Sequence, residues 1–190
     1  MTDFKDKIVL ITGGSRGLGR SMALGFARKG AHIAIVSRKL EVCEQVTEEL
    51  FDKVVGVNLK GPFRLSANVG KRMVEEGSGC IINISSTASV NPSPNSEPYG
   101  ASKAGLNAIT RSFASALGPK VRVNCIIAGP FLTDISKAWD MDAFKKRAAN
   151  SIPMKRGGQP DEIVGAALYL ASDAASFTTA ALLSVDGGSH

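Results

Sequence analysis

A glycine-rich turn between an apolar run and a helical repeat constrains the fold of this chain most. The apolar run, residues 7–12 (KIVLIT), is continuous, which is typical of a strand buried on both faces. The segment after the turn has apolar residues at helical spacing and stops at Gly30, a natural helix C-terminus. A second apolar run, residues 32–37 (HIAIVS), follows. This order predicts a βαβ unit.

The same alternation continues along the chain. It predicts three further strands, at residues 80–85, 121–127 and 182–185. It also predicts helices, at residues 51–76, 98–117 and 161–171. Strands and helices that alternate in this way predict an α/β fold, a Rossmann-like doubly wound parallel sheet with helices on both faces.

Composition narrows the class of protein. A length of 190 residues with 44% hydrophobic residues suits a single domain that spans residues 1–190. No apolar run reaches the roughly 18 residues that cross a bilayer, and the first residues lack the apolar stretch of a leader, so we expect a cytoplasmic protein without a membrane partner. Three scattered cysteines without metal spacing predict reduced thiols and no metal site: Cys43, Cys80 and Cys125.

The net charge of +6 is spread among acidic residues and forms no basic run. We therefore expect no nucleic-acid partner, and instead a solvated surface that attracts an anionic cofactor.

Three elements of the sequence together indicate a redox site. Tyr99 and Lys103 are four residues apart and share one face of a predicted helix. An ammonium beneath a phenol can make the phenol, normally of pKa about 10, usable as a proton donor and acceptor near neutrality. Ser86 lies thirteen residues before Tyr99, at the end of a predicted strand. With the glycine-rich turn, these residues resemble the short-chain dehydrogenase/reductase family, and the resemblance covers nearly the whole chain.

The glycine-rich turn, residues 12–19 (TGGSRGLG), predicts a phosphate-binding site. Gly13 allows the sharp exit from the strand, Gly17 lets the backbone approach a pyrophosphate, and Gly19 lets the helix pack closely. The phosphates would rest on the helix N-terminus. The alternative is a tight turn with a structural role only. The predicted contacts to the cofactor in this turn are Gly13, Ser15, Arg16, Gly17, Leu18 and Gly19.

The residues after the second strand distinguish NADP from NAD. An acidic residue there would bind the ribose hydroxyls of NAD and repel a 2′-phosphate. This chain has Arg38 there, and Arg16 within the turn. Because guanidinium groups suit a phosphate, the sequence favours NADP over NAD.

The family resemblance implies roles for the catalytic residues. Tyr99 would exchange a proton with the substrate oxygen, and Lys103 would assist it and hold the nicotinamide ribose. Ser86 would bind the substrate oxygen, and its spacing from Tyr99 favours it over the competing Ser85.

Asn58 is the fourth member of this predicted set. Pro62 has no N–H, so it leaves the carbonyl of Asn58 without its helical partner. That carbonyl could hold a water that links Lys103 to solvent. The alternative is a helix kink with no catalytic role.

Residues 128–133 resemble the family segment that grips the nicotinamide carboxamide, which implies cofactor contacts at Gly129, Phe131 and Thr133. Residues 133–154 would form a variable lid over the substrate. We expect four side chains to offer apolar surface for an alcohol or ketone of moderate size: Phe131, Trp139, Met141 and Phe144.

The predicted strands number five, whereas the family normally has seven. The shortfall lies near residues 40–51, where the family has two more strands and a helix, including an Asn-Asn-Ala-Gly turn beside the cofactor. Two missing strand-plus-helix units of about thirty residues each correspond to a segment of about sixty residues. Either the chain carries a true internal deletion, or the segment was omitted from the sequence.

Two functions follow as hypotheses. The first is an NADP-dependent oxidoreductase that interconverts a secondary alcohol and a ketone. The second is a catalytically inactive remnant or oligomerising binding module of the same family. In either case the resemblance implies a homodimer or homotetramer, formed through the helices at residues 51–76 and 98–117.

Overall fold

The computed structural model describes residues 4–14, 16–36, 47–92, 94 and 96–189. The chain forms two compact units, and each unit is assembled from separate stretches of sequence. The first unit contains residues 1–42, 129–172 and 185–189, and the second contains residues 43–128, 173–184 and 190. All five predicted strands form, with boundaries that differ from the prediction by at most one residue.

The first unit begins with the predicted βαβ element. Strand β1 (Ile8–Thr12) leads into helix α1 (Gly17–Ala27), and strand β2 (His32–Val36) follows. The two strands are parallel, with Ile8 opposite His32 and Thr12 opposite Val36. The predicted βαβ unit is therefore confirmed.

The rest of the first unit is helical. Its elements are the 3-10 helices η3 (Asp134–Ala138) and η4 (Pro160–Ile163) and the helices α5 (Met141–Ser151) and α6 (Val164–Ala171). Helix α1 packs against η4 and α6. A Cβ atom at Gly25 would collide with the Val164 side chain, so this close packing requires glycine. Phe26 and Ile163 are buried in the resulting core.

The second unit is built on a parallel sheet. Strand β3 (Gly79–Ser86) pairs with β4 (Val121–Ala128) along its full length, from Gly79 opposite Val121 to Ser86 opposite Ala128. Strand β5 (Leu182–Val185) flanks β4 on the other side, so the order is β3-β4-β5. Most side chains of β4 are fully buried.

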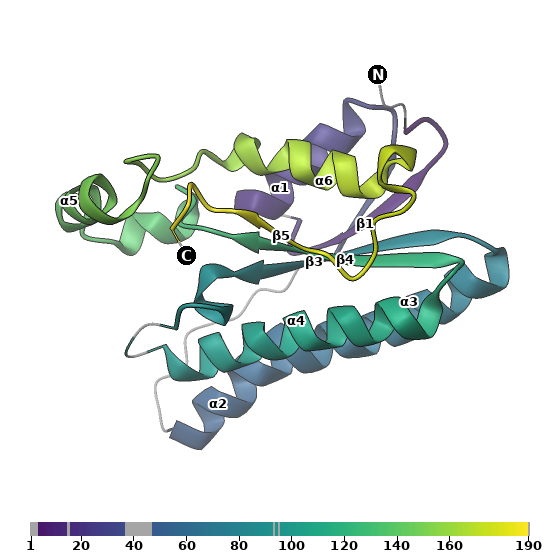
Figure 1. Ribbon diagram of the computed structural model, residues 1–190, viewed down its shortest axis with the longest axis horizontal. Coiled ribbons are helices and arrows are strands. Elements are labelled where there is room, and N and C mark those ends of the chain that lie inside the picture. The colour runs from purple at the N-terminus through teal and green to yellow at the C-terminus, as the bar shows by residue number, and fades with distance from the viewer. Residues whose placement is uncertain (1–3, 15, 37–46, 93, 95, 190) are drawn as a thin grey trace. The chain divides into compact units, whose positions relative to one another are not determined.

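Long helices cover this sheet. The predicted helix at residues 51–76 forms as three consecutive elements: α2 (Thr47–Val55), the π-helical turn η1 (Gly56–Lys60) and α3 (Gly61–Glu76). Helix α4 (Glu97–Leu117) lies beside α3 and packs on β3 and β4 (Figure 1). Two short 3-10 helices complete the unit, η2 (Thr87–Ser89) and η5 (Asp173–Ala175).

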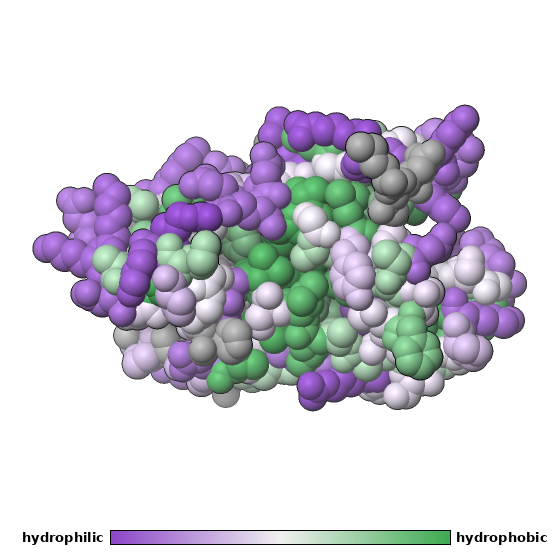
Figure 2. Space-filling model, turned by 45° about the horizontal axis from the view of Figure 1, so that its top comes forward, coloured by the Kyte–Doolittle hydropathy of each residue, from purple (hydrophilic) through white to green (hydrophobic). Residues whose placement is uncertain are grey.

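One expectation about β1 is wrong. The continuous apolar run predicted a strand buried on both faces, but the side chain of Ile8 is 80% exposed and that of Leu10 is 42% exposed. Strand β1 belongs to a two-stranded sheet, which lacks the neighbours that bury a central strand. Apolar residues consequently contribute to the molecular surface, which Figure 2 shows as green areas between more polar regions.

Within the described residues, no helix has the length and apolar character that a bilayer crossing requires. The same residues contain no cluster of three histidine, cysteine or acidic side chains that could hold a metal ion. Among the described residues, Cys80 and Cys125 are not part of a disulfide. Cys43 lies outside the described residues.

Candidate active site

The glycine-rich turn of the first unit has the conformation that its glycines allow. Gly13 and Gly17 have positive φ angles of +71° and +54°. A Cβ atom at Gly19 would collide with the carbonyl oxygen of Gly13, so α1 can start against the turn only with glycine at this position. Helix α1 begins at Gly17 and carries Leu18 and Gly19 in its first turn, so free N–H groups point towards the loop. Ser15 lies outside the described residues.

The predicted carboxamide-binding segment lies beside this turn within the first unit. A Cβ atom at Gly17 would be 3.4 Å from the Cβ atom of Thr133. The segment is fixed by a parallel bridge, in which Leu132 N donates to the carbonyl of Gly158 at 2.8 Å. At its start, Gly129 N donates to the carbonyl of Val185 at 3.0 Å. The fold of the first unit thus brings two predicted cofactor contacts, Gly17 and Thr133, together.

Arg16 lies in the turn with an exposed side chain. The Lys137 ammonium, which is 2.9 Å from the carboxylate of Asp134, lowers the pKa of Asp134, and the charge of Arg16 lowers it further to a smaller extent. The Arg16 guanidinium is therefore near Asp134 and open to solvent. Arg38, the second predicted phosphate ligand, lies outside the described residues.

Two of the four side chains expected to offer apolar surface do not do so. Phe131 and Phe144 are each only 6% exposed. Phe144 packs with Ala148 and Ile152 because these residues share the inner face of the amphipathic helix α5. Trp139 and Met141 pack against this cluster while remaining partly exposed.

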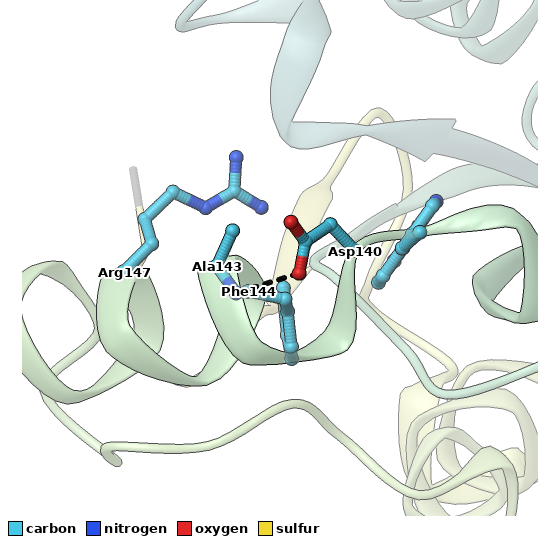
Figure 3. Close-up of a pocket in the computed structure, with 5 residues that line it drawn as sticks. Asp140, Ala143, Phe144 and Arg147 are labelled. Atoms are coloured by element: carbon cyan, nitrogen blue, oxygen red, sulfur yellow. Dashed lines mark hydrogen bonds between the residues drawn. The ribbon is translucent and has the colours of Figure 1, made fainter.

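An open hollow of about 350 Å³ remains on the surface of the predicted lid (Figure 3). The Trp139 and Phe144 rings are 5.1 Å apart beside it, and the Arg147 guanidinium lies 5.6 Å from the Phe144 ring centre. The Asp140 carboxylate accepts hydrogen bonds from the backbone N–H groups of Asp142 and Ala143, so it caps α5. The hollow is therefore bordered by aromatic rings and by charged groups of both signs.

The second unit contains all four predicted catalytic residues. Tyr99 and Lys103 lie on one face of α4, with the Lys103 Nζ atom 5.8 Å from the centre of the Tyr99 ring. Tyr99 is 38% exposed. Lys103 Nζ also donates to the carbonyl of Ile84 at 2.9 Å. This bond ties the ammonium to β3, two residues before Ser86.

Burial sets the electrostatics around Lys103. It lowers the pKa of the Lys103 ammonium, with a smaller opposing effect from the thiol of Cys125. Burial also raises the pKa of Cys125 to about 11, although a hydrogen bond from Ser85 and the charge of Lys103 oppose this. The Cys125 thiol is therefore neutral near pH 7, and Lys103 releases a proton more readily than an exposed lysine does.

Ser85 and Ser86 have different surroundings because neighbouring residues of a strand point to opposite faces. Ser85 is 3% exposed and its hydroxyl donates to the carbonyl of Lys103 at 3.2 Å. Ser86 is partly exposed, and its hydroxyl oxygen accepts from Ala88 N at 3.2 Å. The hydroxyl of Ser89 donates to the Ser86 carbonyl at 2.6 Å. The Ser85 hydroxyl is thus engaged in holding α4, whereas the Ser86 O–H remains available.

The π-helical turn η1 surrounds Asn58. Gly61 N donates to the carbonyl of Gly56, five residues earlier, and Pro62 has no N–H to offer to Asn58. The side-chain amide of Asn58 donates to the hydroxyl of Ser102 at 3.2 Å. Ser102 in turn donates to the carbonyl of Tyr99 at 2.7 Å. Our sequence reasoning did not single out Ser102, although it lies inside the segment 99–103.

Comparisons with known proteins identify the family of this chain. A family model described as short chain dehydrogenase matches residues 7–50, and one described as enoyl-(acyl carrier protein) reductase matches residues 38–190. L-xylulose reductase of Caenorhabditis elegans is 31% identical over 242 positions, which cover 98% of this chain and 96% of the relative. A 3-oxoacyl-(acyl-carrier-protein) reductase of Chlamydia trachomatis is 32% identical over 241 positions, covering 96% and 97%. The chain belongs to the short-chain dehydrogenase/reductase family of oxidoreductases.

Solved structures give the same result. A putative short-chain alcohol dehydrogenase of Sinorhizobium meliloti has a TM-score of 0.89 and 28% identity, covering 98% of this chain and 97% of its own. A putative NAD(P)-dependent gluconate 5-dehydrogenase of Beutenbergia cavernae, with bound NADP at low occupancy, has a TM-score of 0.87 and 27% identity, covering 98% of both chains. The parallel α/β, Rossmann-like fold is therefore confirmed.

The comparisons also confirm that the chain is short. The match to L-xylulose reductase spans 242 positions against 190 residues here, so at least 52 positions, the difference, have no counterpart in this chain. The two family-model matches overlap at residues 38–50. This overlap includes most of residues 40–51, where the sequence places the shortfall.

Proposed function

We propose that this chain is an NADP-dependent oxidoreductase that interconverts a secondary alcohol and a ketone. The observation that carries the proposal is the placement of Lys103. Its ammonium is buried, tied to the Ile84 carbonyl and 5.8 Å from the Tyr99 ring. A cation held in this way beside an accessible phenol suits proton transfer to a substrate oxygen.

Each residue of the second unit has a role in this proposal. The Tyr99 hydroxyl gives its proton to the ketone oxygen during reduction and takes it back during oxidation. The Ser86 O–H donates a hydrogen bond to the same oxygen, since the bond from Ala88 N uses only a lone pair of the Ser86 hydroxyl. The carbonyl of Asn58, free because Pro62 has no N–H, holds a water that connects Lys103 to solvent.

The first unit would hold the cofactor, which supplies or accepts the hydride when bound. The residues fit a dinucleotide because α1 begins directly at the turn, where its first N–H groups can bind phosphate, and because Gly19 lets the helix start against the backbone of Gly13. Backbone groups at Gly129 and Phe131, with the Thr133 hydroxyl, would hold the carboxamide. The remaining N–H groups of Lys103 would hold the nicotinamide ribose.

The preference for NADP rests on Arg16 and Arg38. The B. cavernae structure contains NADP, whereas a relative from Listeria innocua is named an NAD-dependent glycerol dehydrogenase. The test is to measure the dissociation constants of NADPH and NADH. They are compared between the wild-type chain and Arg16→Ala to decide whether this chain prefers NADP or NAD. We expect tighter NADPH in the wild type and a loss of about tenfold for NADPH alone in the variant. Equal affinities in the wild type would contradict the preference.

The second candidate function is an inactive remnant or an oligomerising module. Two observations favour this second function: the exposed apolar side chains of β1, and the positions of L-xylulose reductase that have no counterpart in this chain. Turnover of a panel of ketones with NADPH separates the two candidates. Complete lack of turnover, with a stable oligomer by light scattering, would favour the module. The cytoplasmic location and the homodimer or homotetramer stay predictions.

A further inference from the structure

Ser102 connects two of the proposed active-site residues. Its side chain is fully buried in α4, with 0% exposure. The hydroxyl donates to the Tyr99 carbonyl at 2.7 Å and accepts from the Asn58 side-chain amide at 3.2 Å. The Ser102 hydroxyl therefore donates one hydrogen bond and accepts another, and each bond is to a proposed site residue.

The helix packs against the π-helical turn at this point. A Cβ atom at Gly105 would be 2.8 Å from a methyl group of Leu59, so the Leu59 side chain lies against the helix backbone here. Leu59 directly follows Asn58 in η1. The hydrogen bond between Ser102 and Asn58 is thus accompanied by packing of Leu59 against Gly105.

We propose that Ser102 is a positioning residue, which holds Asn58 in the π-helical turn. Pro62 has no N–H, so the Asn58 carbonyl lacks the donor four residues on that would hold it in an α-helix. The hydrogen bond from the Asn58 side-chain amide to the Ser102 hydroxyl holds Asn58 through its side chain. Because Asn58 is only half-buried, its amide can turn to water when the Ser102 hydroxyl is removed.

The same helix provides a matched control. Thr110 is also 0% exposed, and its hydroxyl donates to the Leu106 carbonyl at 2.8 Å. It accepts from the side-chain amide of Asn83 at 2.9 Å. Ser102 and Thr110 therefore both donate to a carbonyl of α4 and accept from an asparagine amide. Thr110 also contacts the Cys125 thiol, and the asparagine that it holds belongs to β3 and to no proposed site.

The first measurement does not depend on the proposed function. Hydrogen exchange of residues 56–61 is followed by mass spectrometry in the wild-type 190-residue chain, Ser102→Ala and Thr110→Val. We expect exchange to become about tenfold faster in Ser102→Ala, as for the loss of one hydrogen bond. We expect the wild-type rate in Thr110→Val. An unchanged rate in Ser102→Ala, or the same acceleration in both variants, would overturn the proposal.

The catalytic consequence rests on the proposed function. With NADPH and a ketone that the wild type reduces, we expect kcat of Ser102→Ala to fall about tenfold or more while KM stays the same, because Asn58 is displaced. Thr110→Val should keep its kcat. Equal losses in both variants would show that Ser102 is merely structural. If the wild type reduces no ketone, the proposed function fails, and the exchange measurement alone decides whether Ser102 positions Asn58.

Discussion

Strands β1 and β4 are both rich in apolar residues and have very different surroundings. Both lie in parallel sheets, yet Val123 and Ile126 of β4 are 0% exposed whereas Ile8 of β1 is 80% exposed. Strand β4 lies between β3 and β5 and is covered by α4. Strand β1 has β2 as its partner in a two-stranded sheet.

The difference shows what the absent segment contributes. This chain lacks at least 52 positions of L-xylulose reductase, and the family resemblance implies that they include two strands and a helix. An apolar strand with few neighbours exposes side chains at a cost of about 25 cal/mol per Å². The exposed strand β1 belongs to the unit that carries the glycine-rich turn, whereas the second unit holds all four predicted catalytic residues.

The largest expected effect separates catalysis from cofactor binding. Tyr99→Phe should reduce turnover by about a thousandfold, because the hydroxyl that carries the proton is lost while the ring still packs. NADPH binding should remain nearly unchanged. The measurements are steady-state turnover and the NADPH dissociation constant. Residual activity within about tenfold of the wild type would exclude Tyr99 as the acid and base.

A control in the first unit should give the opposite result. Gly19→Ala places a Cβ atom against the Gly13 carbonyl and should abolish NADPH binding. If Gly19→Ala bound NADPH as the wild type does, the turn would be structural only.

The next effect concerns the absent segment itself. A chimera that receives the missing positions from L-xylulose reductase near residues 38–50 should be more stable than this chain. Its turnover should be about a hundredfold higher, because a misplacement of about 1 Å can cost that much in rate. Thermal unfolding with and without NADPH, together with assays on a panel of ketones, tests this. A 190-residue chain with a cooperative transition raised by NADPH, and with turnover equal to that of the chimera, would show that the segment is dispensable.

A smaller effect tests burial directly. Val123→Thr keeps a β-branched side chain but puts a hydroxyl into the core, and should lower the free energy of unfolding by about 1–3 kcal/mol. A threonine in the exposed strand, Ile8→Thr, should change the free energy of unfolding by less than about 0.5 kcal/mol. Urea unfolding of both variants measures the difference. Similar losses would mean that β1 is buried in solution.

The sequence predicted local structure well because local patterns determine it. The strands and α4 form as expected, and the i, i+4 spacing places Lys103 beside Tyr99. Contacts between distant segments could not be predicted in the same way. The bond between Asn58 and Ser102 joins residues 44 apart, and no periodicity in the sequence indicates it.

Burial was the least predictable property. Phe131 and Phe144 were expected to face a substrate, but they are buried by packing in the first unit. Ile8 was expected inside, but it is exposed because the neighbours of β1 are few. An apolar residue indicates a preference for burial, and the presence of other segments decides whether that preference is met.

The smallest expected effect belongs to the surface of the first unit. Arg156 holds the Glu162 carboxylate through two bonds of 2.6 Å, and Gln159 N donates to it as well. The Arg156 bond, followed by the Gln159 bond, lowers the pKa of Glu162 from 4.5 to about 2. A carboxyl whose pKa is lower in the folded state adds stability above its unfolded pKa and loses that contribution as the pH falls. Both side chains are well exposed, so the contribution is small and is screened by salt.

We expect Glu162→Gln to unfold at a slightly lower temperature than the wild type at pH 6. The difference should shrink between pH 4.5 and about 2, the unfolded and folded values. Thermal scans of both proteins across this range measure it, and a difference that is independent of pH would show that the ion pair is not its source.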